Sequence, residues 1–449
     1  MTILKFGGTS MGNENTWRQV LQIITRYEHP FIIVSATSDT TRQLIKTAKL
    51  ALADPEKAYE HASKIEQRHQ KLITNFLANV TITHHSIRKK CQEWIKKQNQ
   101  QLHKLIAQID AEKEINPATM DAIASIGEQL SSYLFAQCGQ ALGLPTQWIN
   151  AADVIRTNSD FGQATPDLTY ITNNLSAIHQ LSADTIPVMG GFYGQDNHGN
   201  ITTLGFEGSD YSASLMGAAL SADAIEIWTD VSGIYTCDPR VIDEAYPIPE
   251  LSFQEATELA YFGAKVLHPS TTKPAALKDI PIKVKNIFDP DAPGTHISTK
   301  VTSNGTAKAM TFKEEALICT VNSSHTVMGY EFLANVFKTL QSLHLPVDVV
   351  TTTEASVSIA IPPCSQLETL VEQLQSAGRI DLQENQAIIS IVGCNPQQST
   401  LLIKETLDGI GEDIINMLSF SHAKRNLNVV LNSDRLLTAV KAIHRKIFT

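Results

Sequence analysis

The sequence has no long hydrophobic run, since no uninterrupted apolar stretch reaches the roughly 20 residues that a membrane-spanning helix needs. The first residues, MTILKFGGTS, lack the apolar core of a secretory signal peptide. The six cysteines form no CxxC pair, which argues against a zinc site or a dithiol motif and favours idle thiols in a reducing compartment. We therefore expect a cytoplasmic protein with no metal ligands of its own.

Positive charge is also scarce, because 36 Lys and Arg residues stand against 46 Asp and Glu residues and the formal net charge is −10. This balance argues against nucleic acid or an anionic membrane as the main partner. The sequence contains no GxxxxGK[ST] loop, no HRD or DFG motif of protein kinases and no GxSxG elbow. Any phosphate-binding site must therefore be assembled from separate turns.

The 449 residues, of which 43% are hydrophobic and 18% charged, predict a globular protein of two or three domains. Short apolar runs separated by helical segments favour a mainly parallel sheet covered on both faces. These runs are residues 3–6, 31–34, 146–149 and 186–189. Residues 55–114 predict amphipathic helices with a solvated polar face. Pro117 begins a further helix that is expected to end near Leu142.

The segment DPDAPG at 289–294 predicts a domain boundary, and the pattern changes beyond it. An order of strand, helix, strand, strand and helix then occurs twice. The predicted strands are 315–321, 347–351, 356–361, 387–392, 413–418 and 427–431, and the predicted helices are 332–343, 366–377, 400–407 and 434–446. Two such units predict a tandem pair of small α+β sandwiches.

The predicted domains are 1–293, 294–384 and 385–449. An alternative assigns the first strand of the second domain, at about 306–313, to the third. The first domain contains all the motifs that are candidates for chemistry.

The first motif is a lysine followed by a glycine turn. Lys5 stands near the end of the first predicted strand, and Gly7 and Gly8 follow it. Because glycine has no Cβ, backbone N–H groups in such a turn can approach phosphate oxygens while the lysine supplies a positive charge. A simple tight turn after an edge strand explains the motif equally well.

The second motif, GFEGSD at 205–210, leads into a helix predicted at 211–219. Ser209 is expected to be its N-cap, and free N–H groups at a helix N-terminus bind anions. Asp210 either complements the helix dipole or serves as a carboxylate near Lys5.

The third motif, WTDVSGIYTCDPR at 228–240, places Thr-Asp at the end of an apolar strand, where ligands collect in open α/β sheets. Tyr235 is a candidate for stacking on a base and Arg240 for binding a phosphate, although a well-capped loop is the alternative. In the fourth motif, FGAKVLHP at 262–269, Lys265 is a second candidate cation and His268 is interpreted as structural.

Together, KFGGTS, TTLG..GSDYSA, WTDVSGIYTCDPR and FGAKVLHP, in this order, resemble the aspartokinases of the amino acid kinase family. The resemblance spans nearly the whole chain, because 332–334 and 347–354 resemble the family's regulatory ACT domains, and the layout is most similar to the monofunctional lysine-sensitive type. It implies a three-layer αβα kinase domain with a mainly parallel sheet, followed by two ferredoxin-like ACT domains. It also implies phosphorylation of the aspartate side-chain carboxylate by ATP with Mg²⁺, which yields 4-phospho-L-aspartate.

The resemblance also implies a role for individual residues. Lys5 would stabilise the transferring phosphoryl group, and Asp210 would orient the lysines. Nucleotide binding is assigned to Lys5, Gly7, Gly8, Ser10, Thr229, Asp230, Tyr235, Arg240 and Lys265, with Mg²⁺ held by the phosphates. Aspartate binding is assigned to Ser35, Thr41, Glu128 and Ser209, with Glu128 facing the substrate ammonium group. Effector binding is assigned to Phe332, Leu333, Asp348, Thr353 and Glu354.

One position departs from the family pattern, which usually reads GRGGSD or GREGSD. Here Phe206 replaces the arginine that clamps a substrate carboxylate, and Glu207 follows it. Losing a bidentate guanidinium–carboxylate contact costs about 2–4 kcal/mol in a desolvated site. Three explanations are open: another cation substitutes, the substrate differs, or catalysis is weak. We favour the first, with Arg42 as the substituting cation.

The paired ACT-like domains imply a homodimer that binds a regulatory amino acid, with lysine the first choice and threonine the second. Asp348 would take the effector ammonium group, unless it is only a strand-end cap. The reaction would be the first step towards lysine, threonine and methionine, under feedback inhibition. The alternatives are a related amino acid kinase with a different carboxylate substrate and a non-catalytic amino-acid sensor.

Overall fold

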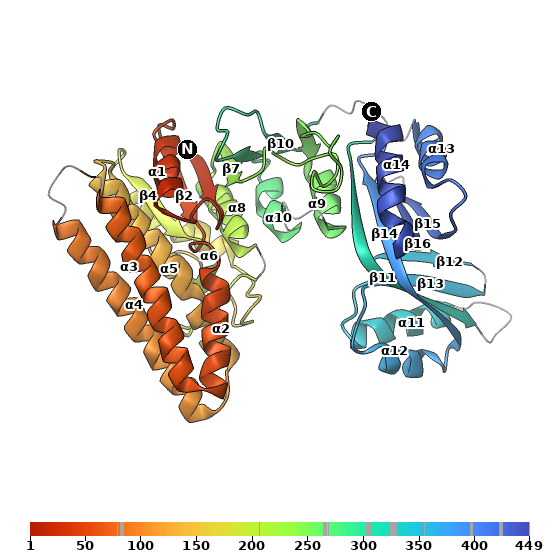
Figure 1. Ribbon diagram of the computed structural model, residues 1–449, viewed down its shortest axis with the longest axis horizontal. Helices are drawn as coiled ribbons and strands as arrows, with labels where there is room; N and C mark the ends of the chain where they lie inside the picture. Colours follow the sequence, from red (N-terminus) through yellow and green to blue (C-terminus); the bar gives the residue numbers. More distant parts are fainter. Residues whose placement is uncertain are drawn as a thin grey trace. The chain divides into compact units, whose positions relative to one another are not determined.

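The computed structural model describes residues 1–78, 80, 85–205, 207–263, 267, 269–301, 307–323, 330–353, 355–395, 398–421 and 425–448 (Figure 1). The chain divides into two compact units. The first comprises Met1–Ile234 and Leu267–Thr299, and the second comprises Tyr235–Val266 and Lys300–Thr449. Within the described ranges, no helix has the length and apolar character needed to cross a membrane.

The first unit is built on a mainly parallel sheet. Its strands are β1 (Thr2–Phe6), β2 (Pro30–Val34), β3 (Thr146–Ile149), β4 (Ile186–Gly190), β7 (Ala224–Thr229), β9 (Ile282–Asn286) and β10 (Thr295–Ser298). They follow the order β3-β4-β2-β1-β7-β9-β10, and only the β9–β10 pair is antiparallel. The mainly parallel sheet predicted from the short apolar runs is therefore confirmed. A separate hairpin joins β5 (Tyr193–Gln195) to β6 (Ile201–Thr203).

Helices cover both faces of this sheet. They are α1 (Glu14–Ile24), α2 (Thr40–Ala53), α3 (Pro55–Ala78), α4 (His85–Glu112), α5 (Pro117–Ala141), α6 (Leu168–Asn173), α7 (Ser176–His179), α8 (Gly208–Leu220), α10 (Pro269–Leu277) and the 3₁₀ turn η1 (Ala151–Asp153). Leu4 and Phe6 point to the core formed with α1–α5, whereas Ile3, on the other face of β1, lies beside Gly217 of α8. Alternate residues of one strand thus pack in opposite layers, which gives the predicted three-layer domain.

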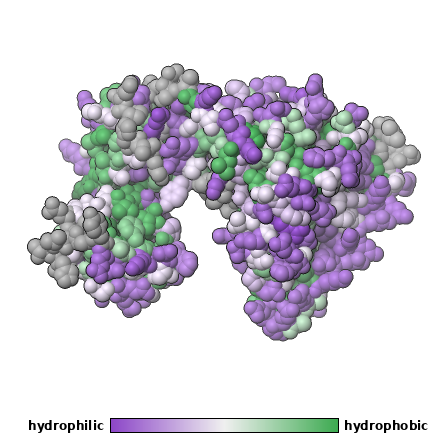
Figure 2. Space-filling view, turned by 180° about the vertical axis from the view of Figure 1, so that it is seen from behind, coloured by the Kyte–Doolittle hydropathy of each residue, from purple (hydrophilic) through white to green (hydrophobic). Residues whose placement is uncertain are grey.

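The long helices have the amphipathic character that the sequence predicts. Trp17 of α1 packs between Phe76 of α3 and Phe135 of α5, with ring centroids 6.4 and 5.4 Å away. Helix α5 begins as predicted, because the Asn116 side chain accepts from the Thr119 N–H group and Pro117 occupies the first turn. The part of the first unit in view in Figure 2, on the right, is largely hydrophilic.

The second unit contains a fully antiparallel sheet in the order β12-β13-β11-β14-β16-β15. Its strands are β11 (Ala309–Ser323), β12 (Val349–Thr352), β13 (Ser356–Ile361), β14 (Gly378–Val392), β15 (Ile415–Ser421) and β16 (Asn426–Asn432). Its other elements are β8 (Glu250–Ser252), α9 (Phe253–Tyr261), α11 (Tyr330–Ser342), α12 (Leu367–Leu374), α13 (Ser399–Ile410), η3 (Ser433–Arg435) and α14 (Leu436–Phe448). Separate cores form under α11 with α12 and under α13 with α14, consistent with two ACT-like modules.

The strands β11 and β14 are longer than predicted, because they pair with each other along most of their length. The register shifts between Lys313 and Ile318, and residues 309–313 pair with 388–392. The extension over 378–385 is polar and largely exposed, so it lacks the apolar run by which a buried strand is recognised.

Candidate active site

A cavity of about 520 Å³ lies in the first unit. Its lining comprises Lys5, Ser35, Thr41, Ile45, Met120, Asp121, Ala124, Glu128, Gly162, Phe192, Thr203, Gly205, Glu207, Gly208, Ser209 and Asp210. A second hollow of about 300 Å³ shares Ser35, Thr41 and Glu128 with it and adds the turn that follows β2. Lys5 lies near the end of β1, and Ser35 and Phe192 follow β2 and β4, so this part of the lining lies at the carboxyl edge of the parallel sheet, where open α/β folds collect ligands.

The centre of the cavity is an ion pair between Lys5 of β1 and Asp210 of α8. The two side chains are only 9% and 7% exposed. An ammonium and a carboxylate that are both withdrawn from water interact strongly but remain costly to bury, so such a pair indicates function more than stability. Asp210 is thus a carboxylate beside Lys5, in addition to its favourable place in the first turn of a helix.

The entry into α8 differs from the prediction, since Ser209 is not the N-cap. Glu207 occupies that position with a left-handed φ of 53°, and its side chain makes no capping hydrogen bond. The chain turns at Gly205, whose carbonyl accepts the Gly208 N–H group at 3.1 Å. Ser209 therefore lies inside the first turn and faces the cavity. Gly191 approaches it so closely that a Cβ there would lie 2.6 Å from the Ser209 Cα atom.

Glu128 of α5 is a buried carboxyl group on the cavity wall. Its Oε1 atom accepts the Ala36 N–H group at 3.2 Å, whereas Oε2 is buried without a hydrogen-bond partner in the described part of the chain. Burial raises the pKa of Glu128 to about 8, although the Ala36 N–H group and the charge of Lys5 act in the opposite direction. A buried acid with one unused oxygen is suited to receive a ligand's ammonium group.

Asp121, two turns before Glu128 on α5, is a cavity residue that the sequence reasoning missed. It accepts hydrogen bonds from the Gly162 N–H, the Thr203 N–H and the Thr203 hydroxyl at 2.7–2.9 Å. Burial raises its pKa, and these three donors oppose that shift. Asp121 thereby fastens the 158–164 loop and β6 to α5. Asp121 could have been found from the sequence, because its spacing from Glu128 places both side chains on the same face of the helix.

The predicted phosphate-binding turn lies against β7. The Gly7 N–H and the Ser10 hydroxyl both donate to the Trp228 carbonyl at 3.2 Å. A Cβ on Gly7 would lie 3.7 Å from the Lys5 Nζ atom, which places this turn beside the ammonium group. Thr229, at the end of β7, donates to the Asp230 carboxylate at 3.2 Å. The glycine turn, Ser10, Thr229 and Asp230 are thus neighbours at the ends of β1 and β7.

Arg42 lines the second hollow together with Ser35, Thr41 and Glu128. Its side chain is 87% exposed and pairs with Asp39 at 3.0 Å. Asp39 precedes α2 with a left-handed φ of 63° and does not cap the helix. The first N–H groups of α2 therefore lack a side-chain acceptor from the cap position.

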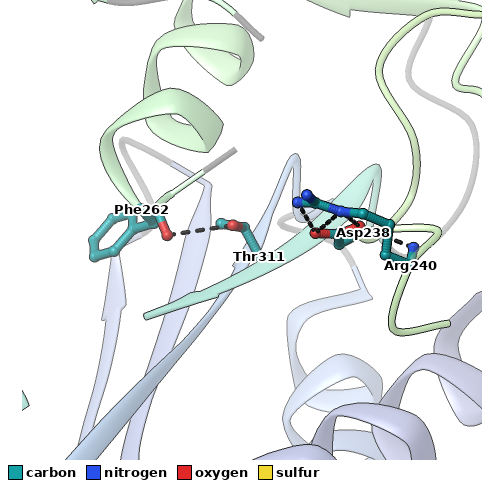
Figure 3. A network of polar contacts seen from close by, with 4 residues as sticks. All are labelled: Asp238, Arg240, Phe262 and Thr311. Atoms are coloured by element: carbon teal, nitrogen blue, oxygen red, sulfur yellow. Dashed lines mark hydrogen bonds and ion pairs between the residues drawn. The ribbon is translucent and has the colours of Figure 1, made fainter. Parts of the chain in front are cut away.

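Other predicted residues lie elsewhere. Phe206, Lys265, His268 and Glu354 fall outside the described residues. Tyr235 and Arg240 belong to the second unit. There the Arg240 guanidinium pairs with Asp238, at 2.6 Å from Nη2 to Oδ2 (Figure 3).

The second unit contains the predicted effector residues. Asp348 precedes β12, and its side chain, 2% exposed, pairs with Lys313 of β11 at 2.6 Å. The Lys313 ammonium lies 4.9 Å from the ring centre of Tyr261, whose hydroxyl donates to the Val347 carbonyl at 2.8 Å. Next along the chain, the Phe262 carbonyl accepts the Thr311 hydroxyl (Figure 3).

The remaining effector candidates are less enclosed. Phe332 and Leu333 are partly buried against the core of the first ACT-like module. The Thr353 hydroxyl is bonded to Ser356 in the turn between β12 and β13.

A mainly parallel sheet with a buried ammonium and glycine turns at its carboxyl edge is an arrangement suited to phosphoryl transfer. The amino acid kinase family model matches residues 1–286. "Aspartokinase 2, chloroplastic" of Arabidopsis thaliana is 31% identical over 99% of this chain and 84% of its own. The lysine-sensitive aspartokinase 3 of Escherichia coli is 29% identical over 100% and 99% of the two chains. This chain therefore belongs to the amino acid kinase family and, within it, to the aspartokinases.

Solved structures agree with this placement. E. coli aspartokinase III in complex with aspartate and ADP (R-state) matches all of both chains with a TM-score of 0.84 at 29% identity. The same enzyme in complex with lysine and aspartate (T-state) matches with a TM-score of 0.79.

Proposed function

We propose that this chain is an aspartate kinase, which transfers the terminal phosphoryl group of ATP to the side-chain carboxylate of aspartate and forms 4-phospho-L-aspartate. The observation that carries the proposal is the buried Lys5–Asp210 pair in one cavity with Glu128. The aspartate and ADP complex of the E. coli relative supports the choice of substrate. The product would enter the synthesis of lysine, threonine and methionine.

The reaction requires charge neutralisation more than proton transfer. The side-chain carboxylate of aspartate is already an anion at pH 7, so no general base is needed. Two anions must approach in line, and fixed positive groups lower the cost of that approach. Lys5 would place its charge at the transferring group, and Asp210 would hold the Lys5 side chain in position.

Aspartate itself would be bound at its two other groups. The free Oε2 atom of Glu128 would receive the substrate ammonium, while the Ser35, Thr41 and Ser209 hydroxyls line the same space. Arg42 would bind the α-carboxylate in place of the arginine that Phe206 replaces. Its present partner, Asp39, costs little to exchange, because exposed ion pairs contribute only about 0–1 kcal/mol.

The nucleotide would bind at the ends of β1 and β7, through Gly7, Gly8, Ser10, Thr229 and Asp230. Tyr235, Arg240 and Lys265 remain predicted contacts. In the part of the chain that the structure describes, no group of three or more His, Cys, Asp or Glu side chains could hold a metal ion. We propose that Mg²⁺ is carried by the ATP phosphates, where it would offset their charge.

Regulation would occur in the second unit. Asp348 would bind the ammonium group of an inhibitory amino acid, and Phe332, Leu333, Thr353 and Glu354 are further predicted contacts. The lysine complex of the E. coli relative supports lysine over threonine. The domain boundaries 1–293, 294–384 and 385–449, the homodimer and the cytoplasmic location remain predictions from the sequence.

The decisive test is ADP release from ATP and Mg²⁺ with aspartate, glutamate, other carboxylic acids or no acceptor. We expect stimulation by aspartate that is lost in Lys5→Ala. Stimulation by another acid instead would indicate a related amino acid kinase. An absence of stimulation by any acid, in protein that still binds lysine, would indicate a non-catalytic sensor.

A further inference from the structure

A buried histidine outside the cavity contacts the turn that forms its wall. His69 of α3 is completely buried, and its Nε2 atom lies 3.0 Å from the Thr37 hydroxyl. The Thr37 hydroxyl in turn lies 2.6 Å from the Thr40 hydroxyl. Both threonines are buried, and Thr37 lines the second hollow. None of these three residues is part of the site assigned above.

The donor and acceptor chemistry of His69, Thr37 and Thr40 determines the direction of each hydrogen bond between them. The His69 Nδ1 atom lies 2.8 Å from the Ile65 carbonyl, which can only accept, so Nδ1 carries the proton. Burial lowers the pKa of His69 to about 4, so the ring is neutral near pH 7 and Nε2 is an acceptor. Thr37 must then donate to His69, and Thr40 must donate to Thr37.

These hydrogen bonds fix the 37–40 turn, whose neighbours on both sides contact the site. The Thr40 N–H group donates to the Thr37 carbonyl at 3.0 Å, so the turn is closed by backbone and side chains together. Immediately before it, the Ala36 N–H group holds Glu128. Immediately after it, Thr41 and Arg42 lie in the first turn of α2, which begins at Thr40. In the middle, the Ser38 hydroxyl donates to the Gly8 carbonyl at 2.9 Å.

We propose that His69 is a positioning residue for the amino-acid substrate: by accepting the Thr37 hydroxyl it fixes the 37–40 turn, and through that turn it orients Glu128, Thr41 and Arg42. The proposal rests on the proposed function, because it names a residue that acts on the same subsite. His69 itself would touch neither substrate nor nucleotide. Its influence should therefore appear in substrate affinity rather than in the chemical step.

The chain offers a matched control for this role. His61, also on α3, has its Nδ1 atom 2.8 Å from the hydroxyl of Thr47 on α2. That pair links α3 to α2 by a histidine–threonine hydrogen bond of opposite direction, because the Thr47 hydroxyl donates to the Gln43 carbonyl at 2.9 Å and accepts from His61, and neither residue lines the cavity or the hollow. His61→Leu should therefore reproduce the structural cost of losing a histidine–threonine bond without the effect on the site.

The experiment compares steady-state kinetics of His69→Leu, His69→Gln and His61→Leu. We expect His69→Leu to raise the KM for aspartate about tenfold, with kcat and the KM for ATP within twofold of the wild-type values. His69→Gln, which retains an acceptor near the Nε2 position, should recover most of the affinity. His61→Leu should leave all three constants unchanged.

An isosteric variant covers the case in which His69→Leu does not fold. Thr37→Val removes the hydroxyl that donates to His69 and should raise the KM for aspartate by the same factor. The KM of the double variant, His69→Leu with Thr37→Val, should be no higher than that of either single variant. In the wild-type enzyme, ¹⁵N NMR of the histidine rings should show a neutral ring protonated at Nδ1 whose signal vanishes in His69→Gln and persists in His61→Leu.

The proposal is overturned if the folded His69→Leu or Thr37→Val enzyme keeps its KM for aspartate, or if His61→Leu raises it equally. It is also overturned if the His69 ring is protonated at Nε2. Wild-type protein that shows no aspartate-dependent ATP turnover would instead refute the proposed function. The NMR assignment of the ring tautomer does not depend on turnover, so the two failures are distinguishable.

Discussion

Lys5 lies near enough to Glu128 for its charge to lower the Glu128 pKa, yet the Lys5 ammonium is paired with Asp210 and not with Glu128. Asp210 and Glu128 therefore differ in environment, although both line the cavity. Asp210 is committed to the lysine, while Glu128 keeps a buried oxygen without a partner. This difference is what the proposed roles require: Asp210 to hold the Lys5 ammonium and Glu128 to receive the substrate ammonium.

The first prediction concerns pH. Because burial raises the pKa of Glu128 to about 8, the group is largely neutral below that pH and binds an ammonium poorly. The kcat/KM for aspartate should thus rise between pH 6.5 and 8.5 and then level. In Glu128→Gln this rise should disappear and the KM for aspartate should increase at least tenfold. A wild-type profile that is flat over this range would contradict the role of Glu128.

The same pKa shift predicts an opposite effect on stability. An acid whose folded pKa lies above its unfolded value stabilises the fold at low pH, and this contribution is lost as pH rises from about 4.5 to about 8. Each pKa unit corresponds to about 1.4 kcal/mol. The Tm of the ligand-free protein should therefore fall over this range more steeply than that of Glu128→Gln, which thermal unfolding at several pH values would measure.

The sequence predicts the elements that position this site wherever a local pattern marks where the helix or strand begins or ends. Helix α5 has Asn116 and Pro117 at its start, and β1 is a short apolar run followed by glycines. The proximity of Asp210 to Lys5 was one of two interpretations of the second motif, and the ion pair between the two side chains agrees with it. The roles of Glu128 and Ser35, in contrast, came from the family resemblance.

The residues that were missed depend on contacts between distant parts of the chain. Asp121 binds groups 41 and 82 positions away, and His69 binds Thr37 from a helix whose composition predicts a solvated face. Apart from the place of Asp121 on the same face of α5 as Glu128, no local pattern marks these buried polar contacts. The N-cap of α8 was also missed, because Glu207, with its left-handed backbone conformation, takes the position predicted for Ser209. This conformation depends on how the chain enters the cavity.

The third prediction tests Lys5. Lys5→Ala removes the buried ammonium and leaves the Asp210 carboxylate without its partner. Because the positive charge is most valuable when charge develops on the transferring group, kcat should fall by at least a factor of about 10², with a smaller change in the KM for aspartate. Asp210→Asn serves as the companion variant and should reduce kcat less. Near-normal turnover in Lys5→Ala would remove the central role of this residue.

The fourth prediction concerns Arg42. If it binds the α-carboxylate, Arg42→Ala should raise the KM for aspartate about tenfold or more while the KM for ATP stays constant. The matched control is Arg26→Ala, since Arg26 is also an exposed arginine in an ion pair, with Asp291 at 2.8 Å, and lines neither the cavity nor the hollow. An unchanged KM for aspartate in Arg42→Ala would dismiss the substitution of Arg42 for the family arginine.

The last prediction addresses regulation through Lys313. Its ammonium group pairs with the Asp348 carboxylate, which is proposed to bind the effector. An effector ammonium must either displace the Lys313 ammonium or share Asp348 with it, so the two positive charges compete. Lys313→Met should therefore lower the lysine concentration for half-inhibition severalfold while it lowers the Tm, because a buried carboxylate loses its partner. Asp348→Asn should abolish inhibition and leave kcat without lysine near the wild-type value. Dose–response curves with lysine would check both, and weaker inhibition of Lys313→Met would show that Lys313 helps to build the effector site and does not compete for it.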